Sequence, residues 1–132
     1  MQFNVRSLED AANTVSAAIP AAGATVTSSS LNVGTGRKSE HLALGVDVPA
    51  LSGLASTKNV TFTLLHSDDN ATFVAVPDAA AQVVTGPVSG GSAATRLRWS
   101  FPTLSKQYIA MQAVADASAG TISGTWYFKI FA

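Results

Sequence analysis

Cysteine is absent from the sequence, and charged residues are scarce. Without cysteine, the chain has neither a disulfide nor a thiolate metal site. Charged residues make up 12% of its 132 residues, whereas a soluble domain usually carries about 25%. The eight basic and eight acidic residues cancel. Because phosphate binding needs a basic excess on one face, we expect no nucleic-acid partner.

The sequence also lacks any long hydrophobic run. No run approaches the roughly 20 apolar residues that cross a membrane, and the first residues do not read as a signal peptide, so we expect no membrane partner. The length suits one domain that buries about two-thirds of its unfolded surface. Zero net charge with a mean hydropathy of +0.27 favours association with neighbours over solubility.

The clearest positive feature is an alternation of apolar and polar residues in the last third of the chain. In residues 93–102, Leu97, Trp99 and Phe101 fall on one face, and Arg96 and Arg98 fall on the other. This period of two is typical of half-buried antiparallel strands. In residues 121–131, one face carries Ile122, Gly124, Trp126, Phe128 and Ile130, opposite Thr125, Tyr127, Lys129 and Phe131.

Six further segments have strand-like composition between breaks at Pro, Gly, Ser and Asp. Together with the two above, they predict about eight short strands at spacings of roughly 8–15 residues. We therefore expect an all-β fold, an antiparallel two-sheet β-sandwich of jelly-roll type, with an immunoglobulin-like sandwich as the alternative. The six segments are residues 24–33, 41–48, 59–66, 73–76, 81–85 and 108–114.

The first 23 residues are expected to form an N-terminal arm, and residues 24–132 the sandwich. Ser7 resembles a helix N-cap, and acidic residues follow it in the first turn. The pattern up to residue 18 leaves a short helix and an extended arm both open. Pro20 ends either one.

The sequence has no grouping of residues that would indicate a catalytic or metal-binding site. The two histidines, His41 and His66, do not cluster with carboxylates, so they are interpreted as strand-end residues rather than metal ligands. Residues 67–70 favour a polar turn over a calcium site, and residues 34–38 a turn over a phosphate loop. We expect no catalytic residue, no metal and no cofactor, and hence no enzyme.

The two tryptophans and the two arginines near them each have two interpretations. Trp99 and Trp126 lie in phase with apolar neighbours, which favours core packing over an exposed sugar-stacking platform. Arg96 and Arg98 lie on the opposite face, where they either meet solvent or contact an acidic partner.

Several of these strands resemble those of the small capsid cement (decoration) proteins of tailed bacteriophages, the kind known from a Bordetella podovirus. The resemblance covers residues 25–131. In this family an Arg-x-Arg strand ending in proline precedes a Lys-x-Tyr strand and a terminal Gly-Thr strand. The matching segments here are Thr95-Arg96-Leu97-Arg98-Trp99-Ser100-Phe101-Pro102, Lys106-Gln107-Tyr108-Ile109 and Gly120-Thr121-Ile122-Ser123-Gly124.

The resemblance implies a jelly-roll protein on the outside of a phage capsid, binding across the boundaries of its subunits. The expected partners are the major capsid protein and a second copy of the chain, as a homodimer rather than a homotrimer. The expected location is the capsid exterior of a virion assembled in the bacterial cytoplasm. The candidate contact residues for the capsid or the second copy are Phe3, Val5, Arg6, Arg37, Lys38, Arg96 and Arg98.

Two other function classes stay open from the sequence. A phage surface adhesin or carbohydrate-binding β-sandwich module would need an exposed aromatic platform. A metal-dependent jelly-roll enzyme would need converging histidine and carboxylate ligands.

Overall fold

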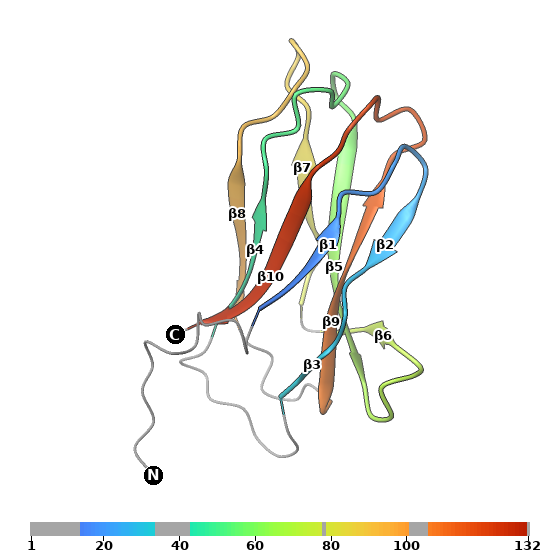
Figure 1. The fold of residues 1–132 in the computed structure, drawn as a ribbon, viewed down its shortest axis with the longest axis vertical. Helices are drawn as coiled ribbons and strands as arrows, with labels where there is room; N and C mark the ends of the chain where they lie inside the picture. Colours follow the sequence, from blue (N-terminus) through green and yellow to red (C-terminus); the bar gives the residue numbers. More distant parts are fainter. Residues whose placement is uncertain (1–13, 34–42, 78, 101–105, 132) are drawn as a thin grey trace.

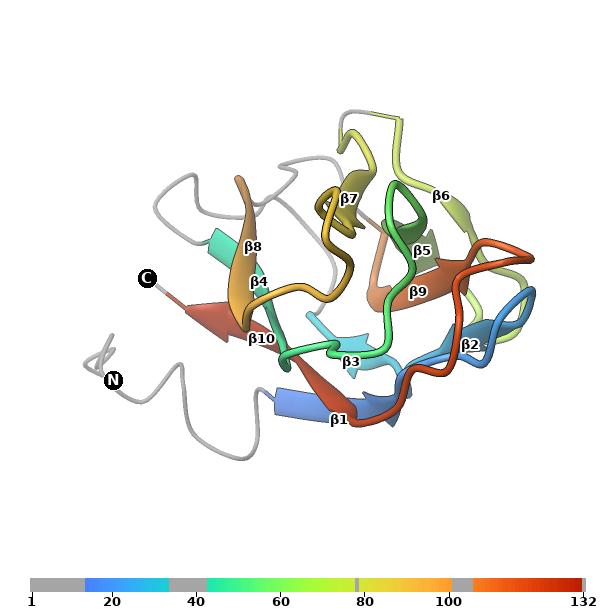
Figure 2. The same cartoon turned by 90° about the horizontal axis from the view of Figure 1, so that it is seen from above.

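The computed structural model describes residues 14–33, 43–77, 79–100 and 106–131 of the chain. In this part, all regular structure is β-strand: ten strands form two antiparallel sheets that pack face to face (Figures 1 and 2). The all-β sandwich predicted from the alternation of apolar residues is confirmed.

Sheet A has four strands, in the order β1-β10-β4-β8. Sheet B has six, because both of its edges are divided. On one edge β2 and β3 pair in turn with β9, and on the other β7 and β6 pair with the two halves of β5. The strands of sheet A are β1 (Thr14–Ala18), β4 (Ala43–Val48), β8 (Thr95–Ser100) and β10 (Thr125–Phe131). Those of sheet B are β2 (Thr25–Thr27), β3 (Leu31–Asn32), β5 (Asn59–Ser67), β6 (Val74–Ala75), β7 (Gln82–Thr85) and β9 (Tyr108–Ala115).

The strand order is that of a jelly roll. When each divided edge is counted as one strand, the described part of the chain has eight strands. Sheet A then reads 1-8-3-6 and sheet B reads 2-7-4-5, the two interlocked Greek keys of the jelly roll. An immunoglobulin-like sandwich would order its strands differently. The first of the two sandwich types expected from the sequence is therefore the one observed.

The core lies between the sheets and is built by the inward residues of each alternating strand. Trp126, Phe128 and Ile130 of β10 are buried, whereas Tyr127 between them is 44% exposed. The aromatic ring of Trp126 meets Phe62 of β5 edge to face, with centroids 5.4 Å apart and planes at 81°. This contact joins the middle of sheet A to the middle of sheet B.

Each tryptophan also donates a hydrogen bond to a backbone carbonyl. Trp126 Nε1 donates to the carbonyl of Ala18 at the end of β1, at 2.9 Å. Trp99 Nε1, on β8, donates to the carbonyl of Ala80 before β7, at 2.7 Å. The prediction that both tryptophans pack in the core is confirmed, and neither forms an exposed platform for a sugar.

The N-terminal segment differs from expectation. Residues 14–18, assigned from the sequence to the arm, form β1 at the edge of sheet A and pair with β10. They are extended rather than helical because Val15 and Ala17 pack against the core at strand spacing. The sandwich thus includes residues that we assigned to the arm. Residues 1–13, with Phe3, Val5, Arg6 and the Ser7 cap, lie outside the described residues.

Two predicted strands are shorter or broken. The segment 24–33 divides at Ser28, whose buried hydroxyl accepts a hydrogen bond from the backbone N–H of Met111 at 3.1 Å. The last strand begins at Thr125 rather than residue 121. Gly120 and Gly124 have φ angles of +92° and +132°, which an L-residue rarely adopts and which interrupt an extended strand.

Replacing Trp126 with Phe is expected to lower the free energy of unfolding by about 2–3 kcal/mol, because it removes the bond to Ala18 and leaves a cavity beside Phe62. Chemical denaturation of the two proteins measures this difference. Tyr127→Phe is the control on the adjacent, exposed position and should change stability by less than about 0.5 kcal/mol. Equal stabilities of Trp126→Phe and the parent protein would contradict this role of the indole.

Candidate interaction surface

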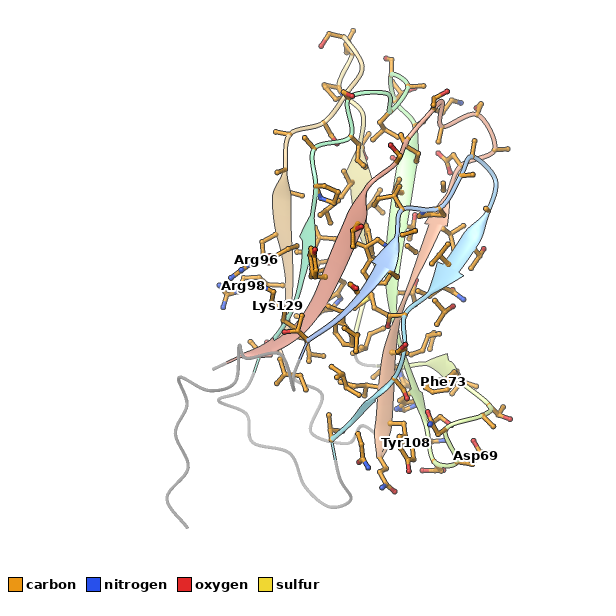
Figure 3. All side chains as sticks on the ribbon, viewed as in Figure 1. Asp69, Phe73, Arg96, Arg98, Tyr108 and Lys129 are labelled. Carbon is orange, nitrogen blue, oxygen red and sulfur yellow. The ribbon has the colours of Figure 1, made fainter. Side chains whose placement is uncertain are left out.

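The outer face of sheet A gathers charged side chains. Asp47 of β4 and Tyr127 and Lys129 of β10 lie at the outward positions of their strands, as do Arg96 and Arg98 of β8. We call these five residues the basic face. Figure 3 shows Arg96, Arg98 and Lys129 on the same flank of the sandwich.

Strand register explains why these residues meet. Asp47 lies directly opposite Arg96 on β8 and opposite Tyr127 on β10. The next outward row places Gly45 between Arg98 and Lys129. Facing residues on neighbouring strands are within reach of one another. Residues far apart in the sequence therefore form one continuous surface.

Asp47 is the centre of the ion pairs on this face. Its Oδ1 accepts from Arg96 Nε at 2.5 Å and its Oδ2 from Arg96 Nη2 at 3.1 Å, a two-pronged contact. Lys129 Nζ lies 2.8 Å from Asp47 Oδ2. The Arg96 hydrogen bond, supported by Lys129, holds the pKa of Asp47 below its ordinary value of 3.8 against the opposing effect of burial.

The basic face has a net positive charge even though the chain as a whole is neutral. Its three cationic side chains face a single carboxylate. The strands of sheet B, by contrast, contain no Asp, Glu, Lys or Arg. Of the five Lys and Arg residues in the described part of the chain, three therefore lie on this face, and Lys58 and Lys106 lie outside it.

The turn after β5 is a polar turn, as its composition predicted. Asp69 Oδ1 accepts from the backbone N–H of Thr72 at 3.0 Å, from Ser67 Oγ at 2.7 Å and from the N–H of Ala71 at 2.9 Å. Together these donors lower the pKa of Asp69 to about 2. A carboxylate oxygen that accepts three hydrogen bonds from its own loop stabilises the conformation of that loop.

His66 lies at the end of β5, the place expected from the sequence. It is 7% exposed, and its Nδ1 accepts from the backbone N–H of Lys106 at 3.3 Å. Burial lowers the pKa of His66. Among the residues that the structure describes, no three His, Cys, Asp or Glu side chains are grouped so as to hold a metal ion. His41 lies outside the described residues.

Two of the seven candidate contact residues, Arg96 and Arg98, are described, and the structure brings them together on the basic face. Sequence reasoning missed Asp47 as their partner and Lys129 as the third cation. The signal for Lys129 was present, because it occupies an outward position of the last strand, but the neighbour relation of β10 and β4 was not readable. Arg37 and Lys38 lie outside the described residues, like the three candidates of the N-terminal arm.

Over the ranges that the structure covers, no helix has the length and apolar character to cross a membrane.

No protein-family model and no curated protein matches the chain. Several solved structures match its fold, and two of them are named here. The phage-derived exported protein XepA of PBSX matches with a TM-score of 0.53 and 16% identity, over 89% of this chain and 35% of XepA. PirA matches with a TM-score of 0.52 and 8% identity, over 89% of this chain and 93% of PirA. The chain thus spans about a third of XepA, and both likenesses show the fold alone.

The ion pairs around Asp47 predict how its pKa changes on mutation and how the stability of the fold depends on pH. Arg96→Ala should raise the pKa of Asp47 toward 3.8 more than Lys129→Ala does, because the Arg96 hydrogen bond is the largest cause of the lowering. Titration of the Asp47 carboxyl carbon by NMR measures both changes. Because the folded pKa is lowered, the stabilisation is present above pH 3.8 and is lost as the pH falls through the folded pKa. For this partly exposed group it amounts to less than about 1 kcal/mol. An unchanged Asp47 pKa in Arg96→Ala would contradict the assignment.

Proposed function

We propose that this chain is a structural virion protein that binds the outside of a phage capsid and cements neighbouring major capsid protein subunits. The observation that carries the proposal is the basic face: Arg96, Arg98 and Lys129 lie together on the outer face of sheet A, in a chain with no net charge. An acidic surface on the capsid is its electrostatic complement.

The arrangement of the basic face favours a protein partner over nucleic acid. The basic face contains three cationic side chains, and the Asp47 carboxylate lies between two of them, Arg96 and Lys129. Phosphate backbones are bound by larger basic excesses, and the Asp47 carboxylate repels them. A protein surface that carries both acidic and neutral groups fits this mixture of charges.

The fold supports a structural role in a second way. The chain shares its jelly roll with a phage-derived exported protein, although this likeness concerns the fold alone. The sandwich joins strands from all parts of the described chain in two hydrogen-bonded sheets. A rigid scaffold of this kind holds a contact surface in shape without reorganisation on binding.

Cementing follows from simple energetics. A protein that contacts two capsid subunits adds its own interface free energy to the contact between them. Copies repeated on a symmetric shell act together, so weak contacts at each position suffice. The proposal includes self-association as a homodimer, the exterior of the capsid as location, and no catalytic, metal or cofactor role. The carbohydrate-binding alternative gains no support from Trp99 and Trp126, which are buried.

Particles that lack this chain are expected to break open at a lower temperature and a weaker osmotic shock than complete particles. The physical reason is the loss of the added interface free energy between subunits. Dye access to the packaged DNA during heating measures the difference, and adding the purified chain back should restore it. Identical opening temperatures with and without the chain would defeat the proposal.

Arg98→Ala is expected to weaken binding to chain-free shells about tenfold, while changing the free energy of unfolding by less than about 0.5 kcal/mol. Arg96→Ala is expected to have the same effects on binding and stability. It also removes the guanidinium group that pairs with the Asp47 carboxylate. Co-sedimentation with shells and chemical denaturation measure the two quantities. Lys106→Ala is the matched control, since Lys106 is a surface cation outside the basic face whose ammonium group lies 3.4 Å from Asp68. Equal losses of binding from Lys106→Ala and Arg98→Ala would speak against the basic face.

A further inference from the structure

His66 is a buried titratable side chain that lies apart from the basic face. It is the last residue but one of β5, at the end of the sandwich where Figure 3 labels Tyr108. Its position follows the same alternation as Phe62 and Leu64, which are fully buried, and His66 itself is 7% exposed. The imidazole ring therefore lies on the inward side of the strand.

The ring of His66 attaches the segment before β9 to the end of β5. Its Nδ1 accepts a hydrogen bond from the part-buried backbone N–H of Lys106 at 3.3 Å. A neutral ring nitrogen that accepts a hydrogen bond carries no proton, so the neutral ring has its proton on Nε2. The acceptor of this backbone N–H is thus a group that can itself take up a proton.

The bond to His66 extends the attachment of β9 to β5 beyond their strand pairing. That pairing begins at Tyr108, opposite Ser67, and Lys106 lies two residues earlier. The ammonium group of Lys106 is also 3.4 Å from Asp68 Oδ2, but both side chains are exposed, and exposed ion pairs contribute little. The hydrogen bond to the ring is therefore the better protected of the two contacts that Lys106 makes with this end of β5.

The surroundings of the ring oppose its protonation. Burial, and after it the charge of Lys106, lower the pKa of His66 below its ordinary value of 6.5, and the Asp68 carboxylate acts in the opposite direction. The next carboxylate, Asp69, accepts hydrogen bonds from its own loop. The neighbouring strands β3, β6 and β9 contain no Asp, Glu, Lys or Arg, and Tyr108 is their only titratable side chain.

Protonation would turn Nδ1 from an acceptor into a donor. The new N–H would then face the N–H of Lys106, and the hydrogen bond would be lost. A charged ring would also occupy a buried position, where the loss of hydration is costly. Both costs disappear when the segment before β9 moves away and water reaches the ring. The neutral ring therefore favours the attached segment, and the charged ring favours its release.

We infer that His66 is an acid-sensitive switch: when its ring takes up a proton, the segment before β9 is released from the end of β5. The switch is a property of this chain alone and does not depend on the proposed function.

The pH range of the switch follows from the direction of the His66 pKa shift. Because the folded pKa is lowered, the stabilisation is fully present above pH 6.5 and declines as the pH falls from 6.5 toward the folded pKa. The pKa values of Asp47 and Asp69 lie below 3.8, so these two carboxylates stay ionised over the upper part of this range.

The first test follows the His66 ring by NMR in a His41→Gln variant, in which His66 is the only histidine of the chain. We expect the titration midpoint of the ring to lie below 6.5, and the neutral ring to show the chemical shifts of the Nε2–H tautomer. The amide signal of Lys106 should shift with the same midpoint and lose its protection against hydrogen exchange as the ring becomes charged. A midpoint at or above 6.5, or a Lys106 amide that does not follow the ring, would overturn the inference.

The second test separates a switch from a purely structural histidine. In the same His41→Gln background, His66→Asn keeps an acceptor oxygen near the position of Nδ1 but does not titrate near neutral pH, and His66→Phe keeps a flat ring without the acceptor. Thermal unfolding of each protein is measured from about pH 7.5 to about pH 5. Over this range the unfolding midpoint of the protein with His66 is expected to fall by at least about 3 °C more than that of either variant.

The two tests are independent of each other. An equal fall of the unfolding midpoint with and without His66 would contradict the switch, because the acid response would then come from other groups. If neither variant folds, the NMR titration of His66 and of the Lys106 amide decides by itself.

Discussion

The packing of sheet A on sheet B through Trp126 is the contact on which the rest of the structure depends. Its ring meets Phe62 across the sandwich, and its N–H holds the end of β1. The inward side of each strand is committed to this core, so polar and charged groups are left to the outer faces and the loops. Trp99 also donates to a backbone carbonyl on the other sheet's side. Its N–H bonds the segment before β7 and so fixes β8, at the far edge of sheet A, to that segment.

This division leads to an uneven distribution of charge. The basic face collects three cations around Asp47, and the strands of sheet B have none. Charge is more often spread over the whole surface of a soluble domain. An uneven distribution of this kind suits a protein that stays in contact with neighbours, because a charged face gives specificity.

The sequence predicted the sandwich and its core well, because alternation at a period of two specifies both the strands and their inward faces. It predicted neither β1 nor the division of the 24–33 segment, since Val15 and Ala17 contact a core assembled from distant strands. Of the basic face, Arg96 and Arg98 were predicted from their outward positions. Asp47 and Lys129 were missed because the pairing of β4 with β8 and β10 is set by the jelly-roll topology, which no local pattern encodes.

Cryo-electron microscopy of the intact particle tests the central claim most directly. The account predicts density for a β-sandwich on the outside of the shell, with the outer face of sheet A against an acidic surface of the major capsid protein. Density for the chain inside the shell or at the tail would contradict it. So would a sandwich seated on the capsid with Arg96, Arg98 and Lys129 directed into solvent.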